Sequence, residues 1–275
     1  MRTSNNPFHR SFMLLMTSIL LGCMASSLAI AQEKVAEVTG QDLPTGVAVM
    51  NNYIEASGGQ QAFDAIKNRY SESTLELVAQ GITLDIQTWA ARPNSLYFLM
   101  ESDIVGKVEK GCDGEVFWES SLMSGPVVHD GVQHIVGVRD STFERFAHWS
   151  DIYESAECIG TAEVGDHNCL EVVLTPKRME EFDDEDAYQP IHLFIDDSDW
   201  LIRKMHSVIK SEAGSIEVQA FADDYREVDG ILFAHQLKMN MLGQTRIVTT
   251  TKLEHNIDMP EDRFALPEDI QKLID

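Results

Sequence analysis

The sequence predicts an α+β fold in which one strongly curved antiparallel sheet carries amphipathic helices. Two observations predict it. From about residue 70 onward, apolar residues recur at every second position, in short segments that turn residues separate at regular spacing. Helical periodicity, by contrast, occurs only in two regions, one before these segments and one among them. Short strands at such spacing are typical of one continuous antiparallel sheet that bends round an interior.

The first 31 residues predict a secretory signal peptide. Arg2 and Arg10 precede an uncharged run that ends in Ala29-Ile30-Ala31, small residues at the positions that a signal peptidase requires. Because a signal peptide implies export, we expect the mature protein to lie in the periplasm.

Two other interpretations of this region stay open. Leu20-Leu21-Gly22-Cys23 resembles a lipobox, in which Cys23 becomes the acylated, membrane-anchored start of the mature chain. A retained membrane span is the third interpretation, although small residues interrupt the second half of the run. After the signal, we expect a flexible N-terminal segment at residues 32–44 and a single domain at residues 45–275.

The chain carries a net charge of −24, from 45 acidic and 21 basic residues. So large an excess of negative charge argues against nucleic acid and against anionic membrane surfaces as partners. It does not by itself identify a partner, and nothing in the sequence predicts a cofactor.

Three segments have helical periodicity. Residues 46–57 place apolar side chains mostly at helical spacing until a glycine pair ends the pattern, and residues 60–67 predict a second short helix. Residues 141–153 predict a third, with Ser141 and Glu144 placed as a capping box. The first two helices are amphipathic, so we expect them to cover the sheet.

Strand patterns fill most of the remaining chain. After the early alternating segments, Asp113-Gly114 predicts a hairpin between residues 108–112 and 115–119, and residues 120–140 predict a loop with weak strand character. The later strands are predicted at residues 157–164, 168–175, 191–196, 201–210, 215–225, 231–242 and 244–255.

Export leaves three cysteines, Cys112, Cys158 and Cys169. A tight hairpin at Gly165-Asp166 places Cys169 opposite about Ala162, several residues along the strand from Cys158. Since a strand rises about 3.3 Å per residue, those two α-carbons are too far apart for a disulfide. We therefore predict no bridge between Cys158 and Cys169.

Motifs of metal or nucleophilic chemistry are absent from the sequence. Its histidines are scattered, and it has no His-Glu-x-x-His, no cysteine pairs at zinc spacing and no Gly-x-Ser-x-Gly. The acidic run at residues 180–186 has no glycine at the turning position of a calcium loop, so it predicts a solvated hairpin loop, with a weak cation site as the alternative. We predict neither an enzyme nor a metal site.

Apolar surface is the feature that points to a function. A sheet closed only partway, with amphipathic helices laid into it, encloses an apolar interior, and methionines adapt such an interior to variable acyl chains. A plain packed core is the competing interpretation for each residue taken alone. The predicted cavity residues are Leu75, Leu77, Leu84, Ile86, Trp89, Leu96, Phe98, Met100, Trp118, Met205, Phe221, Leu237, Met239 and Met241.

The chain resembles a known family. Arg92-Pro93-Asn94 with the apolar residues after it, and then Asp113-Gly114 and Trp118, resemble the corresponding stretch of the LolA/LolB-like lipoprotein carriers. Two further segments, residues 53–59 and 256–267, are similar to the looser relatives called outer-membrane lipoprotein-sorting proteins. The resemblance spans most of residues 45–270.

The resemblance implies an incomplete β-barrel, lidded by helices, whose cavity shelters acyl chains in the periplasm. It implies for Arg92 the role of a latch that hydrogen-bonds the backbone of the lid and holds the empty cavity shut; the alternative is an arginine that only caps or pairs at a strand end. The chain is longer and more acidic than the carriers and has the insertion at residues 180–186. These departures put the carriers' protein partners in doubt.

The expected function is therefore binding or transport of lipid or lipoprotein acyl chains in the cell envelope, together with an envelope protein partner as a further expectation. The first alternative is a non-catalytic envelope-assembly or interaction protein whose core is fully packed. An envelope enzyme is the third hypothesis, and a strongly perturbed carboxylate or histidine in the cavity would indicate it.

Overall fold

The computed structural model describes residues 43–211 and 214–274. The predicted signal peptide, Cys23 and all but the end of the segment 32–44 lie outside the described residues. The helices are α1 (Gly46–Ala56), α2 (Gln60–Ala65), α3 (Gly131–Asp140), α4 (Trp149–Ile152) and α5 (Glu268–Ile274), with a 3₁₀ helix, η2, at Glu185–Tyr188. The strands are β1 (Asn68–Leu77), β2 (Ile82–Ala91), β3 (Ser95–Ser102), β4 (Gly106–Cys112), β5 (Phe117–Ser121), β6 (Gly125–Val128), β7 (Tyr153–Val164), β8 (His167–Pro176), β9 (Ile191–Asp196), β10 (Ile202–Ser211), β11 (Gly214–Val228), β12 (Ile231–Met241) and β13 (Gln244–His255).

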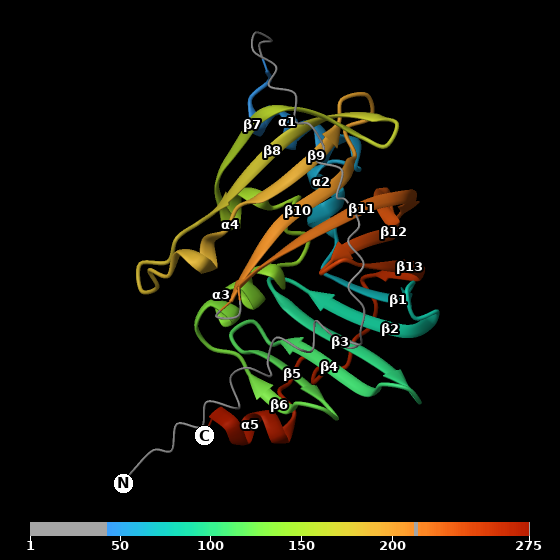
Figure 1. Cartoon of the computed structure of the whole chain (residues 1–275), viewed down its shortest axis with the longest axis vertical. Helices are drawn as coiled ribbons and strands as arrows, with labels where there is room; N and C mark the ends of the chain where they lie inside the picture. The colour runs from blue at the N-terminus through green and yellow to red at the C-terminus, as the bar shows by residue number, and fades with distance from the viewer. Residues whose placement is uncertain (1–42, 212–213, 275) are drawn as a thin grey trace.

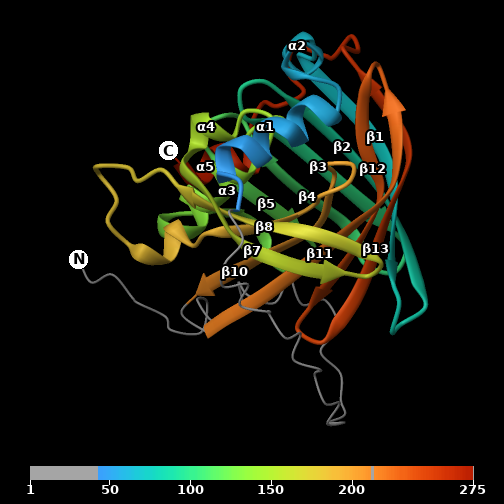
Figure 2. The same cartoon turned by 90° about the horizontal axis from the view of Figure 1, so that it is seen from above.

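All thirteen strands form one antiparallel sheet in the order β6-β5-β4-β3-β2-β1-β13-β12-β11-β10-β9-β8-β7 (Figure 1). Within the described residues its end strands β6 and β7 do not pair with each other, so the sheet stays open. Figure 2 shows that the sheet curves round α1 to α4, which lie in its hollow. This architecture confirms the predicted α+β fold and its strongly curved sheet.

The strand register agrees with the turn chemistry of the sequence. Gly165, in the left-handed region at φ 59°, turns β7 into β8, and Ala162 pairs with Cys169. That pairing confirms the predicted register, and Cys158 pairs instead with Val172. All three cysteines of the described chain are free thiols.

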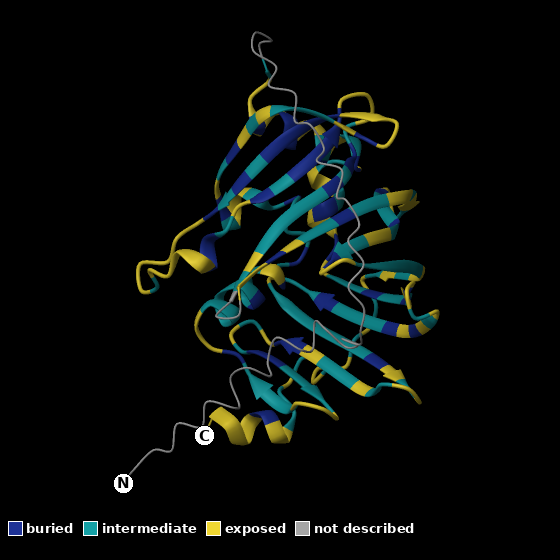
Figure 3. Cartoon of the chain, viewed as in Figure 1, coloured by how far each residue is buried: buried dark blue, intermediate teal, exposed yellow. Residues whose placement is uncertain are grey.

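The interior of the hollow holds two main apolar clusters. In one, Val49 and Met50 of α1 have no exposed surface and pack on the inward residues of β7 to β9. β8 and β9 carry the longest runs of buried residues (Figure 3). α1 can approach β7 this closely because a β-carbon at Gly46 would stand 2.3 Å from the carbonyl oxygen of Ala156.

The second cluster joins α2 to the middle of the sheet. Phe63 of α2 and Ile66, the residue that follows the helix, pack on Ala90 of β2, Ile231 of β12 and Phe143. Only 2% of Phe63 is exposed. A six-residue helix is too short to be stable alone, so α2 depends on this burial and on contacts at its end.

The loop expected at residues 120–140 is wrong over residues 131–140, where a helix forms, whereas β6 confirms the weak strand character expected before it. This region contains β6 and then α3. The composition of α3 does not predict a helix, since it includes two glycines and three valines. Tertiary packing favours the helix, because α3 brings Gly137 against the ring of Phe117, where an added β-carbon would lie 2.2 Å from a ring atom.

The helix expected at residues 141–153 is also wrong over most of its length. Ser141 caps the C-terminus of α3, donating to the carbonyl oxygen of Gly137 at 2.8 Å, and Glu144 has φ 52°, in the left-handed region. Turns follow, and only α4 is helical. The capping box does not form because Phe143 and Ala147 are buried under the sheet and Glu144 turns toward Arg69.

The chain after β13 crosses the outer face of the sheet and ends in α5, an element that the sequence patterns did not indicate. Ile270 of α5 has no exposed surface. Among the described residues, every helix is too short or too polar to pass through a bilayer.

Candidate functional site

Strand register defines which side chains face the hollow. Arg69, Ala90 and Leu96 lie opposite one another across β1, β2 and β3. Ala90 and Leu96 belong to the cluster that contains Phe63 of α2, so this set faces the helices. Because side chains alternate along a strand, the same register assigns the other positions of these strands to the concave or the outer face.

All but three of the predicted cavity residues lie on the concave face. Those of the first strands lie at every second position in step with Ala90 and Leu96. Cross-strand pairing assigns the others to the same face: Val248 of β13 pairs with residues of β1 and β12, and Ala220 of β11 pairs with residues of β12 and β10. The concave residues are Leu75, Leu77, Leu84, Ile86, Leu96, Phe98, Met100, Met205, Leu237, Met239 and Met241.

Six of these residues form part of what we call the concave apolar patch. It is made by β1 to β4 and the β3–β4 turn, and within the described chain no helix contributes to it. Leu77, Leu84, Ile86 and Met100 are buried there, whereas Phe98 is half-buried. The patch consists of Leu75, Leu77, Ile82, Leu84, Ile86, Phe98, Met100, Val105 and Val108.

Trp89, Trp118 and Phe221 lie on the opposite, outer face, so the structure corrects their assignment to the cavity. Trp89 stacks at 4.9 Å from Tyr70, and Arg263 of the C-terminal segment covers it, with 4.4 Å between guanidinium carbon and ring centroid. Phe221 pairs with Lys204, whose ammonium group lies 5.6 Å from the Phe221 ring centroid. One position along a strand separates each of them from the concave face.

Trp118 is almost fully buried on that outer face. It lies 6.3 Å from Tyr97 across Gly111, where a β-carbon would come within 2.7 Å of the indole. These outer aromatic residues fasten the C-terminal segment to the sheet and do not line the hollow.

Arg92 ties the end of β2 to the end of α2. Its Nε donates to the carbonyl oxygen of Ile66 at 2.7 Å and its Nη2 to that of Phe63 at 2.8 Å. These are carbonyls at the C-terminal end of α2, where helical hydrogen bonds run out: that of Phe63 also accepts from the backbone N–H of Ile66 at 3.1 Å. A cation there also complements the negative end of the helix dipole.

The same guanidinium reaches a second part of the lid. Its Nη2 lies 2.9 Å from Nε2 of His148, and its carbon lies 5.6 Å above the ring of Phe143. Because arginine stays charged and has only donors, His148 accepts this hydrogen bond through an unprotonated Nε2. Arg92 therefore joins α2, the segment before α4 and the sheet at one point.

A pocket of about 340 Å³ lies between α1, β1 and residues 140–147. Two ion pairs line it: Arg69 with Glu144, and Arg145 with Asp140 at 2.7 Å. We call it the arginine pocket. Burial, together with the nearby Glu144 carboxylate, raises the pKa of Tyr53, whose side chain forms its α1 wall. The pocket was not foreseen, because nothing in the sequence connects Arg69 with residues 75 positions later.

A further pocket of similar size, about 340 Å³, opens on the outer face beside the β1 irregularity. The walls it takes from β1, β2 and β3 include the carboxylates Glu72, Asp85 and Glu101. Polar side chains line both of these pockets.

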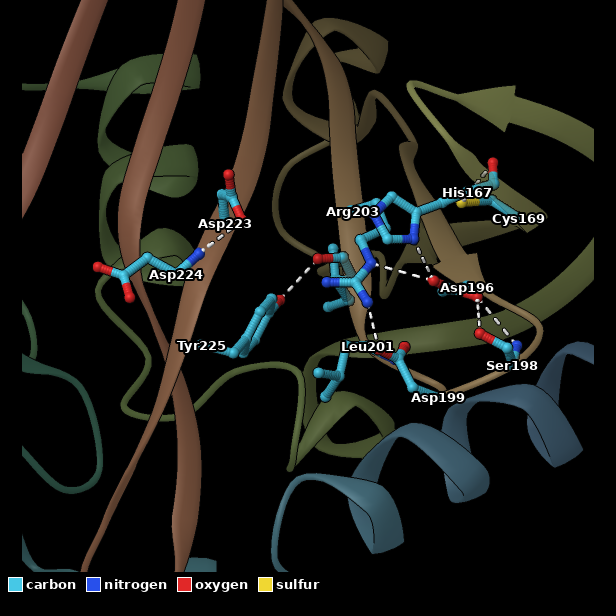
Figure 4. A network of polar contacts seen from close by, with 11 residues as sticks. His167, Cys169, Asp196, Ser198, Asp199, Leu201, Arg203, Asp223, Asp224 and Tyr225 are labelled. Atoms are coloured by element: carbon cyan, nitrogen blue, oxygen red, sulfur yellow. Dashed lines mark hydrogen bonds and ion pairs between the residues drawn. The ribbon is translucent and has the colours of Figure 1, made fainter.

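A buried carboxylate organises the turn between β9 and β10. Asp196 is 2% exposed and accepts hydrogen bonds from the Ser198 hydroxyl at 2.7 Å, from Arg203 at 3.2 Å and from His167 (Figure 4). Burial by itself raises the pKa of Asp196, but these donors outweigh it and lower the pKa to about 2. The network closes the β7–β10 end of the sheet.

The described residues hold neither a metal-ligand cluster nor a cysteine thiol with a lowered pKa. No cluster of three or more histidine, cysteine or acidic side chains among them is arranged to hold a metal ion. Burial raises the pKa of the Cys112 and Cys158 thiols, and burial with the nearby Asp196 raises that of Cys169 to about 12, so none of these is an activated nucleophile.

An open antiparallel sheet curved round short helices defines a half-barrel class of folds. The chain has the LolA-like fold. A structure of a LolA superfamily protein from Nitrosomonas europaea matches it with a TM-score of 0.55 at 13% identity, over 82% of this chain and 99% of that one.

Two other solved structures are similar. A DUF1329 family protein from Desulfovibrio piger has a TM-score of 0.55 at 14% identity, covering 81% of this chain and 98% of that one. A putative outer membrane lipoprotein-sorting protein domain from Vibrio parahaemolyticus has a TM-score of 0.54 at 11% identity, covering 80% and 96%. At these identities the matches show a shared fold.

Sequence comparison is less informative. A family model described as "Uncharacterized protein" matches residues 139–268, from the end of α3 to the start of α5. No curated protein matches the chain.

Proposed function

We propose that the chain binds the acyl chains of lipids or lipoproteins on the concave face of its half-barrel, as a periplasmic or envelope-associated carrier without catalytic activity. The observation that carries the proposal is the concave apolar patch, which lies beside helices that are small, separately attached and joined to the sheet through Arg92. Removing apolar surface from water contributes about 25 cal/mol per Å², so one long acyl chain supplies useful affinity.

In this proposal Arg92 is the latch of the closed, empty state. Its two hydrogen bonds to α2 and its contact with His148 hold the lid against the sheet. A ligand that displaces α2 would have to break these bonds. The fold of the LolA superfamily protein and of the lipoprotein-sorting domain supports this assignment at the level of architecture.

A second candidate is an interaction protein with a permanently packed core. It is favoured by Val49 and Met50, which have no exposed surface against β7 to β9, and by the polar walls of both pockets. The two candidates differ in whether the hollow takes up an apolar ligand.

The first test is to purify the full exported chain without detergent and to analyse its organic extract by mass spectrometry. Lipid in stoichiometric amount supports the carrier proposal and identifies the ligand class. A clean extract, together with no uptake of an added fluorescent fatty acid, would favour the packed interaction protein.

A pair of phenylalanines gives a matched test of the concave face. Phe98→Glu is expected to weaken binding of the fluorescent fatty acid at least tenfold, because a carboxylate would stand among the apolar side chains of the patch. Phe221→Glu is the control: it introduces the same charge on the outer face, beside Lys204, and should leave binding within twofold. Circular dichroism should stay β-rich for both, and equal binding by the two variants would remove Phe98 from the site.

A further inference from the structure

We infer that the arginine pocket is the headgroup site for the ligand of the half-barrel, and that this ligand is an amphiphile with a carboxylate or phosphate at the end of its acyl chain. The inference rests on the proposed function and narrows it from any acyl chain to an acidic amphiphile. It is built on Arg145 and Arg69, which stand in a pocket beside the two apolar clusters of the hollow.

The pocket lies where the two interior clusters meet. Tyr53 packs against both of them, Phe146 belongs to the α1 cluster, and Phe143 to the α2 cluster. Arg69 lies over the rings of Phe143, at 5.6 Å, and Phe233, at 5.3 Å. A polar group bound here would therefore have apolar surface on two sides, which is the environment that an amphiphile requires.

Arg145 can exchange its present partner for a ligand. Its Nη1 donates to Asp140 at 2.7 Å, but the Asp140 side chain is 44% exposed, so water can solvate that carboxylate when the arginine turns away. The Arg145 side chain is only 19% exposed, so it is the solvation of the carboxylate that makes the exchange feasible. A planar guanidinium then offers a carboxylate or phosphate two parallel hydrogen bonds.

Arg69 plays a different part, because its partner is buried. The Glu144 side chain is only 10% exposed and keeps Arg69 paired. That bond uses one guanidinium nitrogen, Nη1, and no other hydrogen bond of Arg69 joins it to a described residue. The remaining N–H groups of Arg69 can donate to a headgroup while the pair with Glu144 stays intact.

Arg145 also contacts the concave face of the sheet. Nη2 of Arg145 lies 3.6 Å from the sulfur of Met205 on β10. Met205 and Met239 share one row across β10, β11 and β12, through Ala220. A chain whose acidic end is held at Arg145 would thus extend over methionine side chains, which adapt to chains of different length.

The test compares myristic acid with myristyl alcohol, which has the same chain and no charge. Both are measured by displacement of a fluorescent acyl probe from the full chain. Arg145→Gln is expected to weaken the binding of myristic acid at least tenfold and to change the binding of myristyl alcohol less than twofold. Arg178→Gln is the control, since it removes an exposed arginine paired with Glu185, outside the hollow, and should change neither.

Each other outcome is decisive. If Arg145→Gln weakens both ligands equally, or neither, the headgroup site is rejected while acyl binding stands. If neither ligand displaces the probe from the wild-type chain, the proposed function itself fails. If acetate or inorganic phosphate displaces myristic acid at equal concentration, the pocket is a free-anion site and its assignment to a lipid is overturned. Should Arg145→Gln not fold, Asp140→Asn with Arg145→Gln removes the ion pair as a unit and gives the same comparison.

Discussion

Replacing Arg92 by alanine is expected to lower the free energy of unfolding by about 3 kcal/mol, because two hydrogen bonds from a charged donor are lost at about 1.5 kcal/mol each. The carbonyl oxygen of Ile66 would then lose its side-chain donor in a buried place, and that of Phe63 would keep only the N–H of Ile66. α2, with six residues, has little intrinsic stability to replace it. Urea unfolding measures the loss, and hydrogen exchange should show faster exchange of the α2 amides.

The control for this prediction is Arg226→Ala. Arg226 makes two hydrogen bonds to Asp224, at 3.0 and 2.6 Å, but the pair is exposed, so its loss should change the free energy of unfolding little. Arg92→Lys should lose part of the stability that Arg92→Ala loses, because a lysine ammonium cannot donate to both carbonyl oxygens in the way that the planar guanidinium does. If α2 exchanges at the wild-type rate in Arg92→Ala, Arg92 is not a latch and is only a strand-end residue.

The same substitution also bears on function. If Arg92 closes the empty hollow, Arg92→Ala should take up a fluorescent fatty acid faster than the wild type, because fewer bonds oppose displacement of α2. An unchanged uptake rate with a large loss of stability would mean that the arginine supports the fold without gating the site.

Alternating patterns predicted the strands well because an antiparallel sheet with one buried face repeats every two residues. β9 and β13 have the boundaries expected from the sequence, and the hairpin at Gly165 has the expected register. The helices were harder to predict from the sequence. α3 contains glycines and valines, which are poor helix formers. It is helical because Gly137 fits against Phe117, and a contact between distant residues cannot be predicted from the local sequence pattern.

The candidate site shows a similar division. Alternation correctly grouped Leu96, Phe98 and Met100 on one face of β3, but it does not say which of two faces looks inward. Trp89 is one position before Ala90 along β2, so its side chain lies on the opposite face of the sheet, away from the hollow. The choice of face is made by the helices and by the C-terminal segment, whose Arg263 covers Trp89.

Arg92 was singled out through a family resemblance, and in the structure it donates two hydrogen bonds to carbonyls at the end of α2; its role as a latch stays a proposal. Arg69, Glu144 and Arg145 had no comparable signal. Charged residues are frequent in this chain, and only the turn structure that follows α3 brings Glu144 to Arg69. Polar pockets built across distant segments therefore depend on the tertiary fold.

Stability in acid should depend on Asp196. The pKa of this carboxyl is about 2 in the folded chain, below its ordinary value of 3.8, so the folded state binds the proton less tightly than the unfolded state does. The stabilisation is complete above the unfolded pKa and is lost as the pH falls from about 4 to about 2. Its size is about 2 kcal/mol, from about 1.4 kcal/mol per unit of pKa.

Asp196→Asn isolates this contribution from the many other carboxylates. At neutral pH the variant should be about 3 kcal/mol less stable, because Arg203, whose side chain is 12% exposed, loses its buried carboxylate partner and keeps only Asp199, which is 42% exposed. As the pH falls toward 2, the difference between wild type and variant should shrink, since the wild-type carboxyl becomes neutral as well. Urea unfolding at a series of pH values measures that difference directly.

Asp224→Asn provides the comparison that makes the result specific. The pKa of Asp224 is also lowered, by its hydrogen bonds from Arg226, but that pair is solvent-exposed and should contribute little at any pH. A difference for Asp196→Asn that stays constant between pH 5 and pH 2 would mean that the substitution only disturbs the β9–β10 turn. A difference that closes in acid shows instead that the charge of Asp196 holds His167, Ser198 and Arg203 together at the end of the sheet.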